Sequence, residues 1–525
     1  MFVRKCSVLA TLNPACVRAR VALRQTWAGP TAALLALALI SGCAVGPDFK
    51  PPPAPEVTGY TKGRMPRTTA AAGGADGAAQ YFAVDRDIPG EWWTLFRSRP
   101  LRILIARAIE NNPDLEAAQA SLRVARHNLY AGWGAFFPSV DGAFSASRQR
   151  PSIGAPSDEA PQPTFNLFTG QVTVSYMPDV FGLTRRTVES LEAQADAQRF
   201  ALEAAYLTLT SNIVVAAVQE ASLRGQIDAT KQIIKLASEF LVILRRQREL
   251  GQIPDADVAA QEAALAQVEQ TLPPLQRQLE QQRHLLTALT GRLPSEEGTE
   301  TFELAALTLP VRLPLSLPSR LVEQRPDIRA AQSNLQSTSA LIGVAVANRL
   351  PNITLTANAG STALKLGDLF TPQTAFWSVA GSVVQPIFHG GTLAQRELAA
   401  RAAYDQAAAQ YRSTVVMAFQ NVADVLSALQ NDAMGLQKAV AAERAASRSL
   451  DIMRRRLQLG DVNFLALLDA QQTYQQALLN VVQARANRHA DTAALFQALG
   501  GGWWNRSDIK PAPRPNLVDE LFIFQ

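Results

Sequence analysis

Hydrophobic positions recur with a helical period over two very long stretches of the chain. Proline is absent from residues 181–253 and again from 387–510. In the second stretch apolar residues step alternately by four and three: Val415, Phe419, Val422, Leu426, Leu429, Ala433, Leu436 and Val440. This spacing is a heptad seam. A helix of about 65 residues would be about 100 Å long, so we expect long helices that pack on one another. A helix buried in an ordinary bundle is the alternative.

A glycine marks the end of the long helix in each half of the chain. Gly251 and Gly460 both follow basic turns, where a helix typically ends and the chain reverses. Each half is therefore predicted to contain a long antiparallel helical hairpin. The pair Pro273-Pro274 should kink or split the returning helix of the first hairpin.

Four shorter segments alternate between apolar and polar residues instead. They are residues 138–149, 168–178, 351–362 and 376–386. Each has the length of a strand that crosses a bilayer, about 9–11 residues, with one apolar and one polar face. Aromatic residues lie near their ends, as at a membrane interface: Phe136, Phe137, Tyr176, Phe376, Trp377 and Phe388. Polar hairpin loops are expected at 150–163 and 365–373.

Four strands cannot close a barrel with a usable lumen, and open strand edges cannot face lipid because their amide groups would be unsatisfied. If these strands lie in a membrane, several chains must share one barrel. The alternative is a small soluble sheet that caps a helical rod.

The chain also repeats itself once. "NPDLEAAQASL" at 112–122 recurs as "RPDIRAAQSNL" at 325–335, and "RRQRELGQI" at 245–253 recurs as "RRRLQLGDV" at 454–462. Phe137-Pro138 and Leu350-Pro351 also correspond, as do "ALTG" and "ALGG" at 288–291 and 498–501. The offset is about 210 residues throughout, far longer than a solenoid unit. We interpret this as a tandem duplication, with repeats at 91–300 and 301–504 and a tail at 505–525.

The amino terminus reads as a secretory signal. The apolar run 32–40 is far shorter than the ~20 residues of a membrane helix, and five basic residues but no acidic one precede Cys43. The run ends in "ISGC", which resembles the lipobox of bacterial lipoproteins. This resemblance implies that residues 1–42 are removed and that Cys43 is lipidated. A non-cleaved anchor is the alternative. An aspartate directly after the lipidated cysteine would resemble the signal that retains a lipoprotein in the inner membrane. This chain has Ala44 there, so we expect transport to the outer membrane.

Residues 43–90 are expected to form a lipid-anchored, Pro-rich leader and a low-complexity linker, "TTAAAGGADGAAQ". Ordered structure is expected to resume near Glu91–Phe96.

Charge and cysteine content exclude several classes of function. The net charge of +5 resides in the signal, so the remaining chain is close to neutral and its pI does not indicate a nucleic-acid partner. Cleavage removes Cys6 and Cys16 and lipidation uses Cys43, which leaves no thiol. The four histidines have no zinc spacing, Asp255 and Asp257 lack a calcium-loop pattern, and no nucleotide-binding or hydrolase motif is present. We expect no enzyme, no metal and no cofactor besides the covalent lipid.

Taken together, the motifs resemble the outer-membrane efflux protein family, the TolC-type outer membrane factors, in the NodT-type lipoprotein branch that partners RND multidrug pumps. The matching segments are "CAVGPDF", "WWTLF", "NPDLEAAQASL", "RPDIRAAQSNL", "PDVFGLTRR", "QPIFHGGTL" and "LGDVNFLALLDAQQT". "RSRP" at Arg97 and "NRLP" before strand three depart from the family pattern.

The resemblance implies an α+β membrane protein. Its homotrimer would form a twelve-stranded outer-membrane β-barrel, four strands per chain, that continues as a long α-helical periplasmic tunnel. It implies a passive exit duct for small molecules, which an inner-membrane efflux transporter delivers through a periplasmic adaptor protein, in the outer membrane of a Gram-negative bacterium. A structural coiled-coil lipoprotein and the exit duct of a protein-secretion or metal-efflux system are the alternatives.

Two places are candidate sites. The helix-reversal turns are expected to meet the adaptor, because loop ends carry recognition; their residues are Gly251, Gln252, Ile253, Gly460, Asp461 and Val462. Plain turns without a partner are the alternative.

The second candidate site is a gate. Leu465 and Asp469 lie one turn apart on one helix face. In the family this segment lines the narrow periplasmic end of the tunnel, where three copies would form an apolar and an acidic ring. Ala260 replaces the acid in the first repeat, and Ala466 replaces a second family acid. Alternatively Asp469 is a solvated residue and Leu465 a packing residue.

Overall fold

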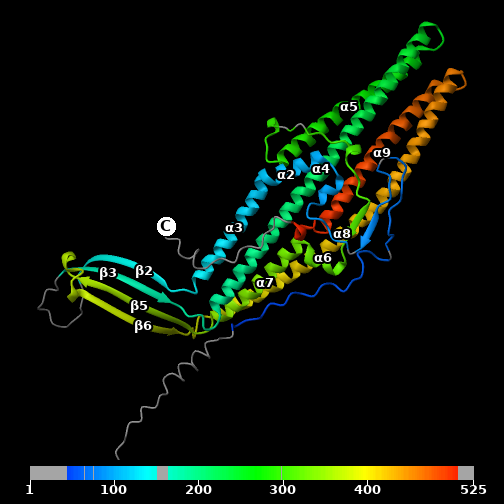
Figure 1. The fold of residues 1–525 in the computed structure, drawn as a ribbon. Helices are drawn as coiled ribbons and strands as arrows, with labels where there is room; N and C mark the ends of the chain where they lie inside the picture. The colour runs from blue at the N-terminus through cyan, green and yellow to red at the C-terminus, as the bar shows by residue number, and fades with distance from the viewer. Residues whose placement is uncertain are drawn as a thin grey trace, which may run out of the picture. The chain divides into compact units, whose positions relative to one another are not determined.

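The computed structural model describes residues 44–506, except 64, 75, 85, 151–163, 297 and 299. The described residues form two long helical hairpins with a four-stranded sheet at one end of them (Figure 1). The predicted signal, Cys43, the loop at 151–163 and tail residues 507–525 lie outside the described residues.

The two halves of the chain have matching elements. Helices α4 (Leu183–Glu249) and α8 (Thr392–Gln458) have 67 residues each, and α5 (Asp255–Leu289) and α9 (Phe464–Ala498) have 35 each. Before them, α3 (Pro113–Gly134) and α7 (Pro326–Ala347) have 22 each. Shorter helices, α2 (Arg99–Asn111) and α6 (Pro318–Gln324), come before α3 and α7. The equal lengths confirm the tandem duplication.

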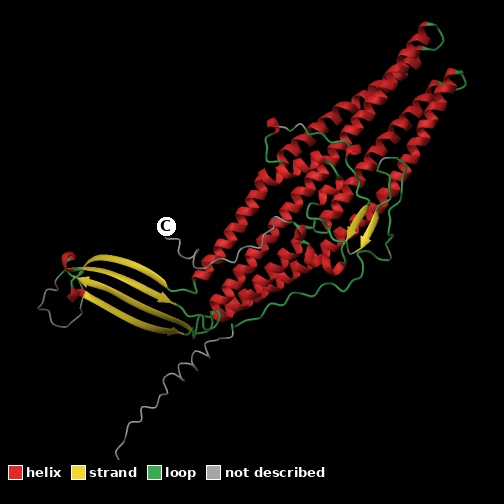
Figure 2. Ribbon diagram, in the orientation of Figure 1, coloured by secondary structure: helices red, strands yellow, loops and turns green. Residues whose placement is uncertain are grey.

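Four strands form one sheet at an end of the helices (Figure 2), and it combines one hairpin from each half of the chain (Figure 1). Strands β2 (Ser139–Gln149), β3 (Phe165–Tyr176), β5 (Asn352–Ala363) and β6 (Ala375–Val384) are antiparallel in the order β2-β3-β5-β6. All four predicted strands are confirmed. Within the described part of the chain, β2 and β6 each pair on one side only, so both outer edges of the sheet are open.

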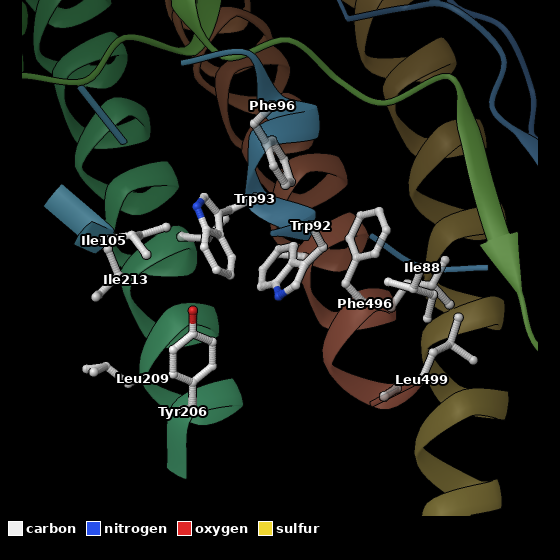
Figure 3. Packing of buried hydrophobic residues seen from close by; sticks show 14 of the residues in the cluster. Ile88, Trp92, Trp93, Phe96, Ile105, Tyr206, Leu209, Ile213, Phe496 and Leu499 are labelled. Atoms are coloured by element: carbon white, nitrogen blue, oxygen red, sulfur yellow. The ribbon is translucent and has the colours of Figure 1, made fainter. Parts of the chain in front are cut away.

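The core lies where the helices run side by side. Helix α4 packs against α3, α5, α7 and α9. The heptad seam of α8 is buried, with Val422, Ala433 and Leu436 at 0% exposure. A short 3-10 helix, Trp92–Phe96, inserts three aromatic side chains, and Trp92 stacks on Phe496 with ring centroids 5.2 Å apart (Figure 3). Of the described helices, only α4 is long and apolar enough to cross a membrane, but 61% of its apolar window is buried. It is a core helix.

Of the two outcomes predicted for Pro273-Pro274, the split of the helix was wrong, and the kink stays a prediction. Helix α5 continues through both prolines without interruption. The two prolines leave the carbonyl oxygens of Glu269 and Gln270 without their helical donors. Both residues are exposed, so water can hydrate these oxygens, and the packing of α5 on α4 keeps the helix intact.

Ordered structure also begins well before Glu91, contrary to the expectation of a linker. Strand β1 (Tyr81–Val84) pairs in parallel with β4 (Arg312–Leu315). Residues 44–80, here called the strap, bond to the helices: the Gln430 and Gln437 amides donate to Thr68 O and Ala71 O, and Arg488 donates to Ala78 O. Buried Gln80 donates to Thr492 Oγ1 at 3.0 Å. Small residues here allow close approach to α8 and α9: Gly73 and Gly74 lie against the side chains of Arg444 and Arg485, and Ala72 packs on an apolar cluster of the two helices.

Candidate functional site

The sheet has one apolar and one polar face, as the alternation predicted. The strand register aligns Val140, Val174, Ala357 and Val379 across all four strands, and Gly142, Val172, Ala359 and Trp377 in the neighbouring row. The opposite face is lined by Asp141, Thr173, Asn358 and Ser378.

The apolar face is exposed in the single chain. Trp377 is 79% and Val379 75% exposed, and Ile387 and Phe388, just after β6, are 94% and 87% exposed. Apolar surface on this scale marks an interface with lipid or protein. A polar face backed by an apolar one is the arrangement of a barrel wall between water and lipid.

The two hairpin turns have the same hydrogen-bonding geometry. Gly251 and Gly460 have φ angles of 71° and 75°, a left-handed conformation that glycine adopts without strain. The amides of Gln252 and Asp461 donate to Gln247 O and Arg456 O at 2.9 Å, which closes each helix with a Schellman motif. Both predicted turns are therefore confirmed as chain reversals, and they lie at the same end of the helices (Figure 1).

Each turn exposes a leucine beside arginines. Leu250 and Leu459 are 58% and 83% exposed. Arg248 pairs with Asp255 at 3.4 Å and Arg456 with Asp461 at 2.7 Å. Ile253 and Val462 are half-buried. An exposed leucine with a charged surround is suited to protein contact, although the role of the turns stays a prediction.

The proposed gate residues lie in the first two turns of α9. Asn463 caps the helix by accepting the Ala466 amide at 3.1 Å. Phe464 and Leu467 are buried at 5% and 0% in a cluster that includes Leu241, Val258 and Leu450 from the other helices. This anchoring turns Leu465, 64% exposed, and Asp469, also exposed, away from the chain's own core.

The first repeat differs at the equivalent position. Ala260 is half-buried and packs against the same apolar cluster, so it offers neither charge nor bulk. Ala466 is also half-buried. The structure thus places Leu465 and Asp469 on one exposed face, while their function as a gate stays a prediction.

Two carboxyl groups, Asp432 of α8 and Asp491 near the end of α9, interact within the second hairpin. Burial, and then a hydrogen bond and repulsion from Asp432, raise the pKa of Asp491 to about 7. No local pattern could indicate this pair, because the two residues lie on different helices.

We expect Asp491→Asn to raise the melting temperature of the detergent-solubilised protein at pH 8, and to raise it less as the pH falls. Native Asp491 keeps its proton up to about pH 7, whereas the unfolded chain loses it near pH 3.8. The free energy of unfolding therefore falls as pH rises through that window. Asparagine keeps a hydrogen-bond donor without the charge. The matched control is Asp424→Asn, an exposed site on α8. Equal effects of both variants at all pH values would contradict the prediction.

Among the described residues, no group of three or more His, Cys, Asp or Glu side chains could hold a metal ion. Sequence reasoning missed one polar site, around Arg186 on α4. Its side chain is 6% exposed and bonds to Val45, Gly46 and Asp48 of the strap. The motif "PDVFGLTRR" contains this arginine, but no periodic pattern showed what it binds.

Comparison with known proteins identifies the chain. The sequence profile described as outer membrane efflux protein matches it twice, over residues 104–292 and 317–501. The chain belongs to the outer membrane efflux protein family. The toluene efflux pump outer membrane protein TtgF of Pseudomonas putida is 30% identical over 479 residues, which cover 89% of this chain and 96% of TtgF.

Two further relatives extend the match. The probable outer membrane lipoprotein SilC of Salmonella typhimurium is 26% identical, over 89% of this chain and 97% of SilC. The solved structure of the outer-membrane channel OprN is 26% identical, with a TM-score of 0.79, and the match covers 88% of this chain and 100% of OprN.

These matches confirm the predicted family, the channel fold and the outer-membrane location. This outer membrane efflux protein provides an exit duct for an efflux system.

Proposed function

We propose that three copies of the chain close one twelve-stranded barrel, with β6 of each copy pairing to β2 of the next. The support is the open sheet: β2 and β6 are exposed along nearly their whole length, and both carry part of an apolar face that lipid would cover. A membrane permits strands only in a closed barrel. The alternative, a structural lipoprotein that tethers the envelope, would need no amphipathic sheet. The sheet therefore favours an exit duct over a tether.

We propose further that the duct is passive and performs no catalysis. Its partners would be a periplasmic adaptor and an inner-membrane efflux transporter, and no nucleic acid. TtgF is named for toluene efflux, and another relative is named for pyoverdine export. We therefore propose a small organic cargo rather than a protein or a metal ion. Single-channel currents in a planar bilayer would support the duct, and purified trimer without currents would contradict it.

The hairpin turns are proposed to dock the adaptor. Across three chains, two equivalent turns per chain would present six similar sites, each with an exposed leucine. We expect cysteines placed at Gln252 or Asp461 to crosslink to the adaptor in intact cells. A cysteine at the exposed Asp424, far along α8, is the control and should not crosslink. Failure at both turns, with normal trimer levels, would show that the adaptor docks elsewhere.

Cys43 is proposed to be the lipidated first residue of the mature protein. We expect Cys43→Ser to block processing, so that the full precursor with residues 1–42 accumulates. Mass spectrometry of the wild-type amino terminus should show an acylated cysteine. An unmodified cysteine at a mature amino terminus would refute the proposal. Ala44→Ser, which leaves the thiol in place, should be processed normally.

A further inference from the structure

The first described residues of the chain are fixed at the foot of the sheet, where β3 leads into α4 (Figure 1). The amide of Val45 donates to Phe181 O at 3.1 Å. A Cβ atom on Gly182 would lie 2.7 Å from the Cα of Ala44, so only glycine permits this approach. Gly182 also has a φ of 83°, which disfavours any side chain.

Arg186 holds the start of the strap. Its Nε donates to Val45 O at 3.0 Å, and a terminal nitrogen donates to the Asp48 carboxylate at 2.8 Å. Across the strap, a Cβ atom on Gly343 of α7 would lie 2.8 Å from Val45 O. The start of the strap is thus clasped between α4 and α7, which holds the first described residue, Ala44, against Gly182.

A groove of about 340 Å³ lies beside this clasp. It is formed by the strand–helix junctions of both repeats, and its apolar lining includes Val180, Phe181, Leu183, Leu350, Ile353 and Val384. Phe181 and Leu183 flank Gly182, the residue against Ala44. The charged lining residue, Asp179, is already engaged, because its carboxylate accepts the amides of Thr184 and Arg185 at 3.0 and 2.9 Å.

We propose that this groove seats an acyl chain of the chain's own lipidated Cys43. The proposal rests on the lipidation of Cys43 proposed above. Consecutive Cα atoms are about 3.8 Å apart and Ala44 lies against Gly182, so an acyl chain on Cys43 would be within reach of this groove. Most of the lining is apolar, with Asn348, Asn352 and Thr354 as its uncharged polar residues and Asp179 already paired, so the groove can accept a hydrocarbon chain. The acyl chain would then pack against the junctions between the strands and the helices, and the strap would hold it in this position.

The test uses the full-length protein from cells grown with a diazirine-bearing fatty acid. After ultraviolet activation and digestion, we expect peptides that contain Cys43 to be crosslinked to residues 177–183 and 347–354. Arg186→Ala should release the strap and abolish most of these crosslinks. Arg199→Ala, on the same helix but without a strap contact, should retain them. Val180→Trp should fill the groove and displace the chain while trimer levels stay normal.

Each outcome decides a different point. Acylated Cys43 crosslinked only to membrane lipid, to other residues or to a neighbouring copy would overturn the groove and leave lipidation intact. Groove residues crosslinked to phospholipid rather than to the Cys43 peptide would overturn it too. An amino-terminal peptide without acyl groups would overturn both the groove and the lipidation of Cys43.

Discussion

Replacing Leu465 and Asp469 together with alanine is expected to raise the single-channel conductance several-fold and to let large antibiotics enter cells that lack the pump. The two side chains project from the start of α9 while Phe464 and Leu467 hold the helix in the core. Truncation therefore removes bulk and charge at the proposed constriction, while the buried residues that hold the helix are unchanged. Three carboxylates in a ring would also attract cations and repel anions.

The separate variants divide these effects. Asp469→Asn keeps the size of the side chain and removes the charge, so we expect reduced cation selectivity with little change in conductance. Leu465→Ala should widen the pore with selectivity retained. Both are measured from currents and reversal potentials in a planar bilayer.

A matched control keeps the same chemistry elsewhere. Leu398 and Asp424 are exposed on α8, and replacing both with alanine should change neither conductance nor antibiotic sensitivity. If the Leu465 and Asp469 double variant forms normal trimer and still shows native conductance, the gate lies elsewhere in the tunnel.

Features with a regular period could be predicted from the sequence. The heptad seam from Val415 to Val440 correctly predicted the buried face of α8. Gly251 and Gly460 correctly predicted where the chain reverses. The alternation in residues 351–362 gave a strand with an apolar and a polar face. Such patterns are local. A helix or strand with one buried and one solvent-facing side repeats apolar residues at its own period, and this repeat can be seen in the sequence.

Contacts between distant residues could not be predicted in this way. Arg186 holds residues about 140 positions away, and Gln80 bonds to Thr492 across 412 positions. Neither leaves a repeating pattern in the sequence. The strap also has a composition typical of linkers, although its small residues are what allow it to lie against α8 and α9. Pro273 and Pro274 show the opposite case, in which a strong local signal was outweighed by packing along a long helix.

An arginine placed on strand β6 is expected to have opposite effects at two neighbouring positions, because adjacent residues of a strand face opposite sides of the sheet. Val379 lies on the apolar face, opposite Ala357, and Ser378 lies on the polar face, opposite Asn358. An arginine on the lipid side of a barrel costs about 2–4 kcal/mol near the bilayer midplane. A closed trimer would bear that cost once in each chain.

We therefore expect Val379→Arg to abolish heat-resistant trimer in the outer membrane, and Ser378→Arg to assemble at native levels, because its side chain would enter the aqueous lumen. Semi-native gel electrophoresis of outer-membrane fractions measures both. The pair separates membrane insertion from strand pairing, since each variant adds the same arginine to neighbouring positions of the same edge strand. Equal loss in both variants would mean that β6 tolerates arginine on neither face. Equal retention would place the apolar face against something other than lipid and would remove the support for a shared barrel.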